Sequence, residues 1–498
     1  MRKAVLILIF ALLAAGAASA QDIQIITDEE ALFGSADEMP VEGAAPPADG
    51  KTGDSLFSAS EDELFQDEGV ERIQSGAEGT AVAAFLKTDA VRIGGTFTGS
   101  VDSEWTWTDP WTVNADPLDP DAASLPTALS ALVFFDARPE EDYRVYGSAK
   151  TGWPFADADG EPNIRVFELF SDFNWNDAVF LRFGKHTVKW GVGYFWSPAD
   201  VLNLSAIDVE DPTAQREGPI SLRAHFPVPG TQTNLWGYLL APNVADASAL
   251  EPADLAAAGK LEFLVGGWEL GMGAFYQQDR APKAIMTATG ALGRFNLFGE
   301  AVLGWGSDTN LATDIEESAS PPYITVSLGK IEDEPVFSGT GGFSWSESDW
   351  NLAVSGQYFF NGESYEDSDR KTLIASARDI QASPPAGSDA GLLATSIKGL
   401  IYGSGRHYAG LSVSKTELWT EDLSVSLLAI ANLSDLSGMV APTVSYELFE
   451  RMTLRAGATF YWATDLLWGA GDDGEYVVVA GGPAVTLSLG ASLGGGRF

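Results

Sequence analysis

Cysteine is absent from this chain of 498 residues, and basic residues are scarce. Without cysteine no disulfide can form, so stability must come from burial of apolar side chains or from closure of a sheet. The chain has 29 Lys and Arg against 70 Asp and Glu, which gives a formal net charge of -41. It therefore lacks the basic surface that nucleic-acid phosphates require, and we expect no nucleic-acid partner.

Long apolar runs are confined to the first residues. Arg2 and Lys3 precede the run AVLILIFALLAAG, and the small residues Ala18-Ser19-Ala20 follow before Gln21. A basic end, a short apolar run and a small-residue cleavage site are typical of a secretory signal peptide, which we assign to residues 1–20. No later stretch offers about 20 uninterrupted apolar residues, so we expect no spanning helix after this segment.

Catalytic and metal-binding patterns are also missing. The three histidines, His186, His225 and His407, fall on different predicted strands or loops, and there is no G-x-S-x-G sequence. We therefore expect no enzyme, no catalytic residues and no cofactor. The Asp-rich stretches 116–121 and 471–475 have ligands suitable for calcium, but neither has the spacing of a twelve-residue calcium loop. Solvated turns are the alternative that we favour for both, with no metal site.

The residues that are abundant indicate β-structure. The chain has 53 glycines, 15 tryptophans and 13 tyrosines. From about Val82, segments of roughly ten residues alternate between apolar and polar side chains and end at Gly, Asp, Asn or Pro. In the first of them Val91, Ile93 and Phe97 alternate with polar residues. We predict an all-β fold, a transmembrane antiparallel β-barrel of about 16 strands (range 14–18) that occupies residues 81–498.

The lengths of the connections favour the barrel over other all-β folds. Short connections at 174–177, 266–267 and 346–349 contrast with long polar ones at 106–126, 307–321, 362–400 and 465–475. Short turns on one rim and long loops on the other are typical of outer-membrane barrels. A sandwich or propeller would also alternate, but we find neither a blade-length repeat nor a linker after residue 80. The terminal Phe498 resembles the signal by which barrel assembly machinery recognises its clients, so we expect that partner.

Residues 21–80 have a different composition. They are acidic, rich in Ala, Gly, Pro and Ser, and show no sustained period, so we expect a disordered periplasmic tail. An acidic residue lies near Leu-Phe three times, at 30–33, 54–57 and 63–65. These repeats are either a chance product of low complexity or short docking peptides for a periplasmic partner or the barrel mouth.

The most distinctive stretch lies between two predicted strands, at 183–223. It contains Gly184-Lys-His-Thr-Val-Lys-Trp190-Gly191 and then Pro198-Ala-Asp200-Val-Leu-Asn203. These segments resemble porin-like outer-membrane proteins of bacteria, in which a G-[KR]-x4-W-G strand leads to a P-x-D-x2-N loop. The chain differs in its acidic tail and in having Leu204 where a proline commonly follows the asparagine. The resemblance implies a diffusion or export channel in the bacterial outer membrane, with lipid and a small solute as partners.

We place the candidate pore constriction in and beside this stretch. Strand alternation turns Arg182 and His186 inward, and Arg223 shares the inward parity of the returning strand. The hypothesis is that Arg182, Arg216 and Arg223 form a basic wall that faces loop carboxylates led by Asp200, because rings of charge set ion preference in a pore. The alternative is that these charges are loop-anchoring pairs or ordinary rim residues. The candidate residues are Arg182, His186, Trp190, Asp200, Asn203, Arg216, Glu217 and Arg223.

The functional prediction is a porin-like channel for passive diffusion of small solutes, narrowed by the loop 190–217. The alternative is a surface adhesin or binding protein on a blocked barrel, which the long connection 362–400 favours. Conductance separates the two, because a blocked barrel gives no current steps.

Overall fold

The computed structural model describes most of the region in which the barrel is predicted. The described residues are 91–108, 123–140, 142–156, 162–214, 216–241, 251–317, 324–384, 396, 398–449, 451–463, 474–480 and 484–497. The expected signal peptide (1–20), the expected acidic tail (21–80), the Asp-rich stretch 116–121 and Phe498 lie outside them. The predictions for those segments stay predictions.

Strands dominate the described residues. The strands of the main sheet are β1 (Val91–Thr108), β2 (Ala123–Ser124), β3 (Thr127–Glu140), β4 (Tyr143–Ala156), β5 (Pro162–Trp175), β6 (Val179–Lys185), β7 (Ile220–Val228), β8 (Thr233–Ala241), β9 (Ala256–Val265), β10 (Trp268–Gln277), β11 (Lys283–Leu292), β12 (Phe295–Trp305), β15 (Pro335–Glu347), β16 (Leu352–Phe360), β17 (His407–Lys415), β18 (Leu423–Asn432), β19 (Ser437–Phe449), β20 (Met452–Trp462) and β21 (Ala484–Arg497). A separate hairpin consists of β13 (Leu311–Glu317) and β14 (Ile324–Gly329). The helices in the described residues include η4 (Pro252–Asp254), η5 (Ser348–Trp350), α4 (Asp367–Ala382) and α6 (Glu475–Val479).

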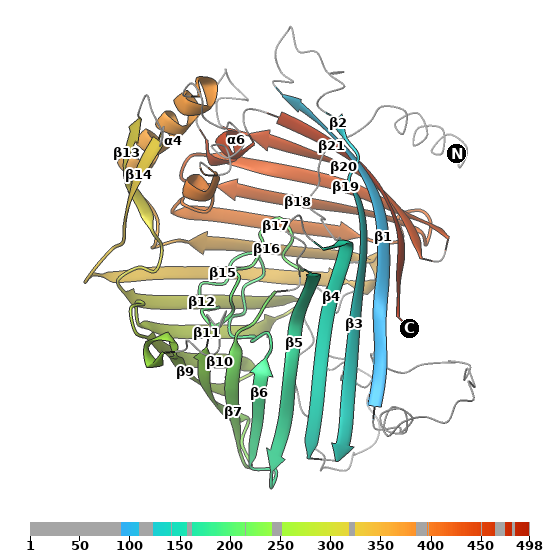
Figure 1. Cartoon of the computed structure of the whole chain (residues 1–498), viewed down its shortest axis with the longest axis vertical. Helices are drawn as coiled ribbons and strands as arrows, with labels where there is room; N and C mark the ends of the chain where they lie inside the picture. The colour runs from blue at the N-terminus through green and yellow to red at the C-terminus, as the bar shows by residue number, and fades with distance from the viewer. Residues whose placement is uncertain are drawn as a thin grey trace. The chain divides into compact units, whose positions relative to one another are not determined.

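The main sheet closes on itself (Figure 1). Each long strand pairs antiparallel with the next, and β1 pairs with both β3 and β21, which joins the two ends of the sheet. The result is a closed antiparallel β-barrel of 18 strands, with β2 as a short addition beside β1. Closure satisfies the backbone groups that an open sheet would leave at its edges.

The predicted fold is confirmed, and the strand number lies at the upper end of the predicted range. The sequence indicates about 16 strands, whereas the barrel has 18. β11 shows the weakest alternation of apolar and polar side chains. Its sequence, KAIMTATGAL, consists mainly of Ala, Gly and Thr and has few large apolar residues. Its pairing with β10 and β12 places it in the sheet regardless of that weak pattern.

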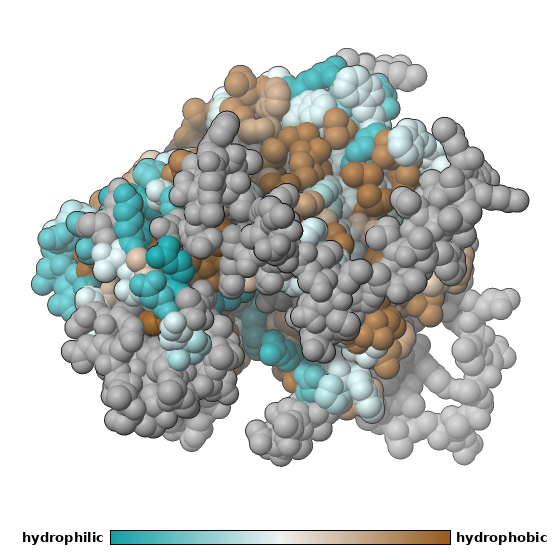
Figure 2. Space-filling model, turned by 90° about the horizontal axis from the view of Figure 1, so that it is seen from above, coloured by the Kyte–Doolittle hydropathy of each residue, from teal (hydrophilic) through white to brown (hydrophobic). Residues whose placement is uncertain are grey.

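Side chains alternate between the two faces of the wall. On β1, Ile93, Phe97 and Val101 are exposed on the outer face, and large exposed hydrophobic residues recur on nearly every strand of the barrel. On the opposite parity Thr106 pairs with Thr486 of β21, and their hydroxyl oxygens lie 3.1 Å apart. Figure 2 shows hydrophobic residues gathered in broad patches on the visible surface. The outer face is therefore apolar, and the inner face of β1 and β21 is polar.

The two rims differ as the sequence indicates. Tight turns join β5 to β6, β9 to β10 and β15 to β16, at the three positions predicted. The first of these spans residues 176–178, and Asn176 and Asp177 both have φ of 52°, the left-handed conformation that the two central residues of a type I′ turn require. At the other rim, two of the connections expected only to be long and polar contain the β13–β14 hairpin and α4. α4 forms because Leu373, Ile374 and Ala377 recur at helical spacing and are buried.

Buried apolar residues form three clusters inside the described part of the chain. The first lies between residues 188–202 and the inner face of β8–β12 and includes Trp190, Tyr238 and Phe275. The second packs α4 against Tyr365, Ile401 and neighbouring residues. The third joins Phe195 and Val209 to Ile430, Met439 and Tyr476. Among the described residues, no helix combines the length and apolar character needed to cross a bilayer.

Candidate functional site

The connection between β6 and β7, residues 186–219, folds against the inner face of the barrel; we call it the lumen loop. It leaves β6 after Gly184, whose φ of 136° is accessible to glycine but strained for other residues. A Cβ at Gly184 would overlap the backbone of Leu169, and one at Gly218 would overlap the backbone of His186. The two glycines thus let the ends of the loop pass close to the wall and to each other. Lys185 and Glu217 form an ion pair across this base.

The P-x-D-x2-N segment clamps the loop internally. Asn203 donates through Nδ2 to the backbone carbonyl of Val188 at 2.7 Å and to Asp200 Oδ1 at 2.8 Å. Its Oδ1 accepts the backbone N–H of Val188 at 2.9 Å. Arg216 forms an ion pair with the same Asp200. The motif therefore ties the outgoing arm of the loop to its returning arm.

Two polar side chains on distant strands hold the loop to the inner wall. Glu300 of β12 accepts the backbone N–H of Gly193 at 2.7 Å and that of Ala199 at 2.9 Å, as well as the hydroxyl of Ser197 at 2.8 Å. Gln357 of β16 accepts the backbone N–H of Phe195 at 2.7 Å through Oε1. It also donates to the carbonyl of Trp196 and to Thr340 Oγ1.

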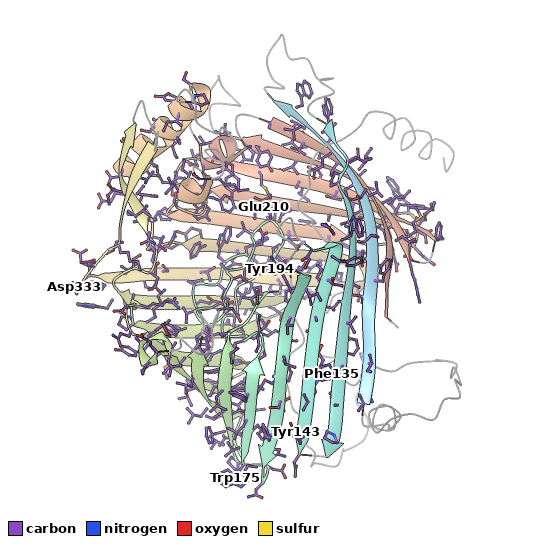
Figure 3. All side chains as sticks on the ribbon, viewed as in Figure 1. Phe135, Tyr143, Trp175, Tyr194, Glu210 and Asp333 are labelled. Atoms are coloured by element: carbon purple, nitrogen blue, oxygen red, sulfur yellow. The ribbon has the colours of Figure 1, made fainter. Side chains whose placement is uncertain are left out.

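Aromatic side chains complete the attachment. Trp190 is buried and packs edge-on against Tyr238 of β8, with ring centroids 5.2 Å apart, while Lys260 of β9 donates to its backbone carbonyl at 3.0 Å. Phe195 is fully buried over Gly410 of β17, where a Cβ would overlap its ring. The loop therefore reaches from β6 across to strands far along the barrel wall. In Figure 3, Tyr194 and Glu210 lie over the middle of the ring of strands, whereas Trp175 lies at the tip of the β5–β6 hairpin.

A row of arginines crosses the inner face beside the base of the loop. Arg144, Asp172, Arg182 and Arg223 lie opposite one another on β4, β5, β6 and β7. Arg182 binds Asp172 in a bidentate fork, with N–O distances of 2.7 and 3.1 Å, and its guanidinium lies 3.9 Å from the ring centroid of Phe170. The guanidinium of Arg223 lies 5.4 Å from the ring centroid of Trp236.

The eight sequence-derived candidates fall into two groups in the structure. Six belong to the lumen loop: Asp200, Asn203 and Arg216 meet in the internal clamp, Glu217 pairs at the base, and His186 and Trp190 are buried. The other two, Arg182 and Arg223, lie on the wall. The hypothesis sets Arg216 on a basic wall opposite Asp200, whereas the structure places both on the loop and in contact. Arg182 pairs with Asp172 of the neighbouring strand.

Glu300 and Gln357 are functional residues that sequence reasoning missed. Each has a detectable signal, because each is a large polar residue at an inward position of a strand made mostly of small or apolar residues, FNLFGEAVLGW and LAVSGQYFF. Alternation alone shows that they face inward. It does not show that they face a loop more than one hundred positions away in the sequence.

Fold and site together define a closed antiparallel barrel with a loop folded into its interior. Among solved structures the chain is similar to a BenF-like porin from Pseudomonas fluorescens Pf-5 (9% identity, 82% of this chain and 98% of that one, TM-score 0.43). It is also similar to OccK2 (OpdF) of Pseudomonas aeruginosa (10% identity, 81% and 97%, TM-score 0.41) and to Salmonella typhi OmpF in complex with daunomycin (11% identity, 81% and 97%, TM-score 0.37). No family model and no curated protein matches the chain. At these identities and scores we derive neither function nor substrate from the likeness.

Proposed function

We propose that the protein is a porin-like channel of the bacterial outer membrane, through which small solutes diffuse passively, and that the lumen loop narrows it. The observation that carries the proposal is the attachment of this loop to the far wall through Glu300 and Gln357. A loop held inside a closed barrel reduces the cross-section of the interior. The proposed activity is transport without catalysis.

The outer face of the barrel supports the membrane location. Exposed leucine, valine, isoleucine and phenylalanine side chains point outward on successive strands. Such a surface is unfavourable in water and favourable against lipid acyl chains. Exposed Trp153 and Trp305 lie near the long-loop ends of β4 and β12, while Trp175 and Trp350 lie at the short turns. Tryptophans at both rims match the two interfaces of a bilayer.

The inner face of β1 and β21 is polar, which supports a solute path along these strands, away from the strands that hold the lumen loop. β21 and β1 carry Ser488, Thr486, Glu104 and Thr106 on their inner faces, in register across the two strands. These strands are not among those that hold the loop through Glu300, Gln357 or Trp190. A polar wall of this kind solvates a hydrophilic solute. We therefore propose that solutes pass between the lumen loop and this polar wall.

Charge beside the loop is proposed to set ion preference, as the sequence-derived hypothesis holds. Two of the charged groups are already paired, because Arg182 binds Asp172 and Arg216 binds Asp200. Removing one member of such a pair changes the local charge by a full unit, although Arg144 also lies 3.9 Å from Asp172. Ion selectivity of variants is thus a sensitive reporter of where the constriction lies.

The adhesin or binding protein on a blocked barrel is the second candidate. It is favoured by the packed core of α4 with Tyr365, Ile401 and Val478 at the long-loop side, because a rigid cap is a suitable binding surface. Single-channel recording of the full-length protein in planar bilayers separates the two candidates. Current steps support the channel; a folded, inserted protein without steps supports the blocked barrel.

Several expectations concern residues outside the described part of the chain. We propose that residues 1–20 are removed on export and that 21–80 form a periplasmic tail with a periplasmic partner. We also propose that barrel assembly machinery recognises the C-terminal strand. A liposome-swelling series with sugars, amino acids and organic acids would identify the class of solute.

A further inference from the structure

A second inward segment, the short helix α6, lies in the connection between β20 and β21. Glu475, Tyr476, Val477 and Val478 are all at least 98% buried, so the solvated turn expected for 471–475 is wrong at Glu475. Val479 is partly buried, so this five-residue helix needs partners over most of its surface. α6 packs against β19 and β20. These wall strands come after β12 and β16, the strands to which the lumen loop is attached, in the order of strands around the barrel.

α6 shares a buried hydrophobic cluster with the lumen loop. Tyr476 belongs to the same buried cluster as Phe195 and Val209 of the loop and Ile430 and Met439 of the wall. Phe195 is the residue whose backbone N–H is held by Gln357. The helix, the lumen loop and the inner face of β18 and β19 thus contribute to one buried cluster.

α6 also contacts the cap at the long-loop side. Val478 belongs to the buried cluster that contains Leu373 and Ile380 of α4, together with Ile401. One face of this short helix thus packs on the loop in the barrel, and another packs on α4. A displacement of α6 would disturb both.

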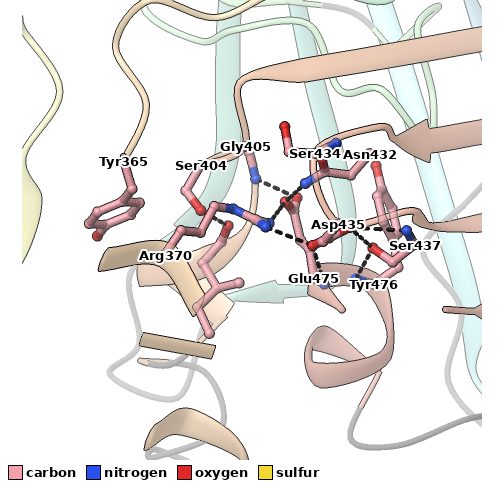
Figure 4. Close-up of polar contacts among 12 residues, drawn as sticks. Tyr365, Arg370, Ser404, Gly405, Asn432, Ser434, Asp435, Ser437, Glu475 and Tyr476 are labelled. Carbon is pink, nitrogen blue, oxygen red and sulfur yellow. Dashed lines mark hydrogen bonds and ion pairs between the residues drawn. The ribbon is translucent and has the colours of Figure 1, made fainter. Parts of the chain in front are cut away.

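Glu475 fixes the position of the helix (Figure 4). Its carboxylate is fully buried and accepts hydrogen bonds from Tyr408 Oη at 2.8 Å, Asn432 Nδ2 at 2.6 Å and the backbone N–H of Gly403 at 2.8 Å. Arg370 of α4 donates to it at 2.7 Å. The donors come from β17, β18, the segment before β17 and α4.

Asp435 extends this arrangement to the start of the helix. It accepts the second guanidinium N–H of Arg370 at 2.7 Å and the backbone N–H of Glu475 at 2.9 Å. It also accepts the hydroxyl of Ser437 at 2.7 Å. A buried carboxylate surrounded by donors is costly to disturb, because loss of its charge leaves several buried donors without a strong acceptor.

We propose that α6 is a second constriction element and that Glu475 is its positioning residue, so that the narrow part of the barrel is built from α6 and the lumen loop together. The inference rests on the proposed channel function. It adds that the sequence 474–480, and not the loop 190–217 alone, sets the cross-section. Glu475 acts through the helix and does not contact the solute.

The test uses single-channel conductance of full-length Glu475→Gln and Tyr476→Ala in planar bilayers, with Glu347→Gln as control. Glu475→Gln removes the carboxylate that binds Arg370, and Tyr476→Ala removes the aromatic ring from the cluster that contains Phe195, without touching the ion pair. We expect each to raise the conductance by about half or more, or to add frequent transitions to a larger level. Glu347 lies at the opposite rim, so the control should conduct like the parent.

A second measurement separates displacement of α6 from general loss of structure. Because the chain has no cysteine, Val477→Cys gives a single thiol in a position that is 1% exposed. A water-soluble thiol reagent should label this thiol slowly when Val477→Cys is the only change, and at least tenfold faster when Glu475→Gln is added. An unchanged mobility shift between unheated and boiled samples would show that the barrel is intact in both.

The outcomes are distinguishable. If the parent conducts, and folded Glu475→Gln and Tyr476→Ala conduct like it while the thiol introduced by Val477→Cys stays protected, the inference is wrong and the channel function stands. If the parent itself gives no current steps, the proposed function fails first. If Glu475→Gln does not fold, Tyr476→Ala alone decides, since it retains the whole polar cluster.

Discussion

Ser197 and Glu300 are 103 positions apart in the sequence, yet the hydroxyl of Ser197 donates to the Glu300 carboxylate at 2.8 Å. This hydrogen bond joins the lumen loop to β12 on the far wall. Three backbone N–H groups of the loop, those of Val192, Gly193 and Ala199, converge on the same carboxylate at 2.5, 2.7 and 2.9 Å. A single wall residue therefore binds the loop at four donors, and Gln357 adds a second attachment on β16.

The base of the loop depends on Gly184. Alanine there is strained at φ of 136° and overlaps the backbone of Leu169, so Gly184→Ala should destabilise the folded protein by about 3 kcal/mol. Gly230→Ala is the matched control, because its φ of 73° is also positive but nothing lies within 4 Å. The control should cost about 1 kcal/mol. Urea titration of both variants in lipid vesicles measures the difference, and equal costs would contradict the close approach.

The lipid-facing surface is tested on β18. Leu427 shares the outward parity of Val425, so Leu427→Arg should destabilise the barrel by about 2–4 kcal/mol if it lies near the middle of the bilayer. Ser426→Arg is the control on the inward parity and should cost much less. Folding titrations into vesicles measure both. Similar small losses at the two positions would point to a sheet whose outer face meets water.

Ion selectivity tests the charged groups beside the loop. Arg182→Ala and Arg223→Ala should shift selectivity towards cations, and Asp200→Ala towards anions. The Arg182 change should have the larger effect of the two arginine changes, because it also leaves Asp172 without its bidentate partner. Reversal potentials across a salt gradient measure the shifts. If all three folded variants select like the parent, the constriction lies elsewhere.

Acid should loosen the attachment between the loops at 306–310 and 361–366. Burial raises the pKa of Glu363, but the charge of Lys283 and the hydrogen bond from Thr309 outweigh it and lower the pKa below its usual value. Asp308 is similar: burial raises its pKa, but hydrogen bonding from Arg280 and the charge of Lys283 outweigh burial and lower the pKa.

A carboxyl group whose pKa is lower in the folded state stabilises that state above its unfolded pKa, and this contribution is lost as the pH falls through the folded value. The attachment should thus be constant above about pH 5 and weaken progressively below about pH 4. Hydrogen exchange of the amides of Asp308 and Thr309, which donate to Glu363, measures it. Protection that is unchanged down to about pH 2 would contradict this explanation, and Glu363→Gln should remove most of the pH dependence.

The fold could be predicted from the sequence because the two faces of a barrel strand meet different surroundings. Phe183 and Arg182 show this within one strand, the first exposed outside and the second buried inside. β11 could not be predicted from alternation. It pairs with its neighbours through its backbone, and its alanine, glycine and threonine side chains do not distinguish an apolar face from a polar one. α4 and the β13–β14 hairpin were expected only as long polar connections, since their apolar residues pack on other loops and not on the wall.

The site was predictable only in part, for a similar reason. The motif that contains Asp200 and Asn203 is local, and the structure shows that it clamps the loop in which it lies. Glu300, Gln357 and Glu475 act across distances that depend on the number and stagger of the strands. The number and stagger of the strands follow from closure of the whole sheet, and they cannot be read from any short segment of the sequence.

The central claim is that the lumen loop narrows an open barrel, and conductance of the full-length Glu300→Ala variant in planar bilayers tests it most directly. The change removes the acceptor of three backbone N–H groups and of the Ser197 hydroxyl. We predict current steps in the parent, larger and noisier steps in Glu300→Ala, and parent-like steps in the rim control Glu347→Ala. Identical conductance of folded parent and Glu300→Ala would contradict the claim.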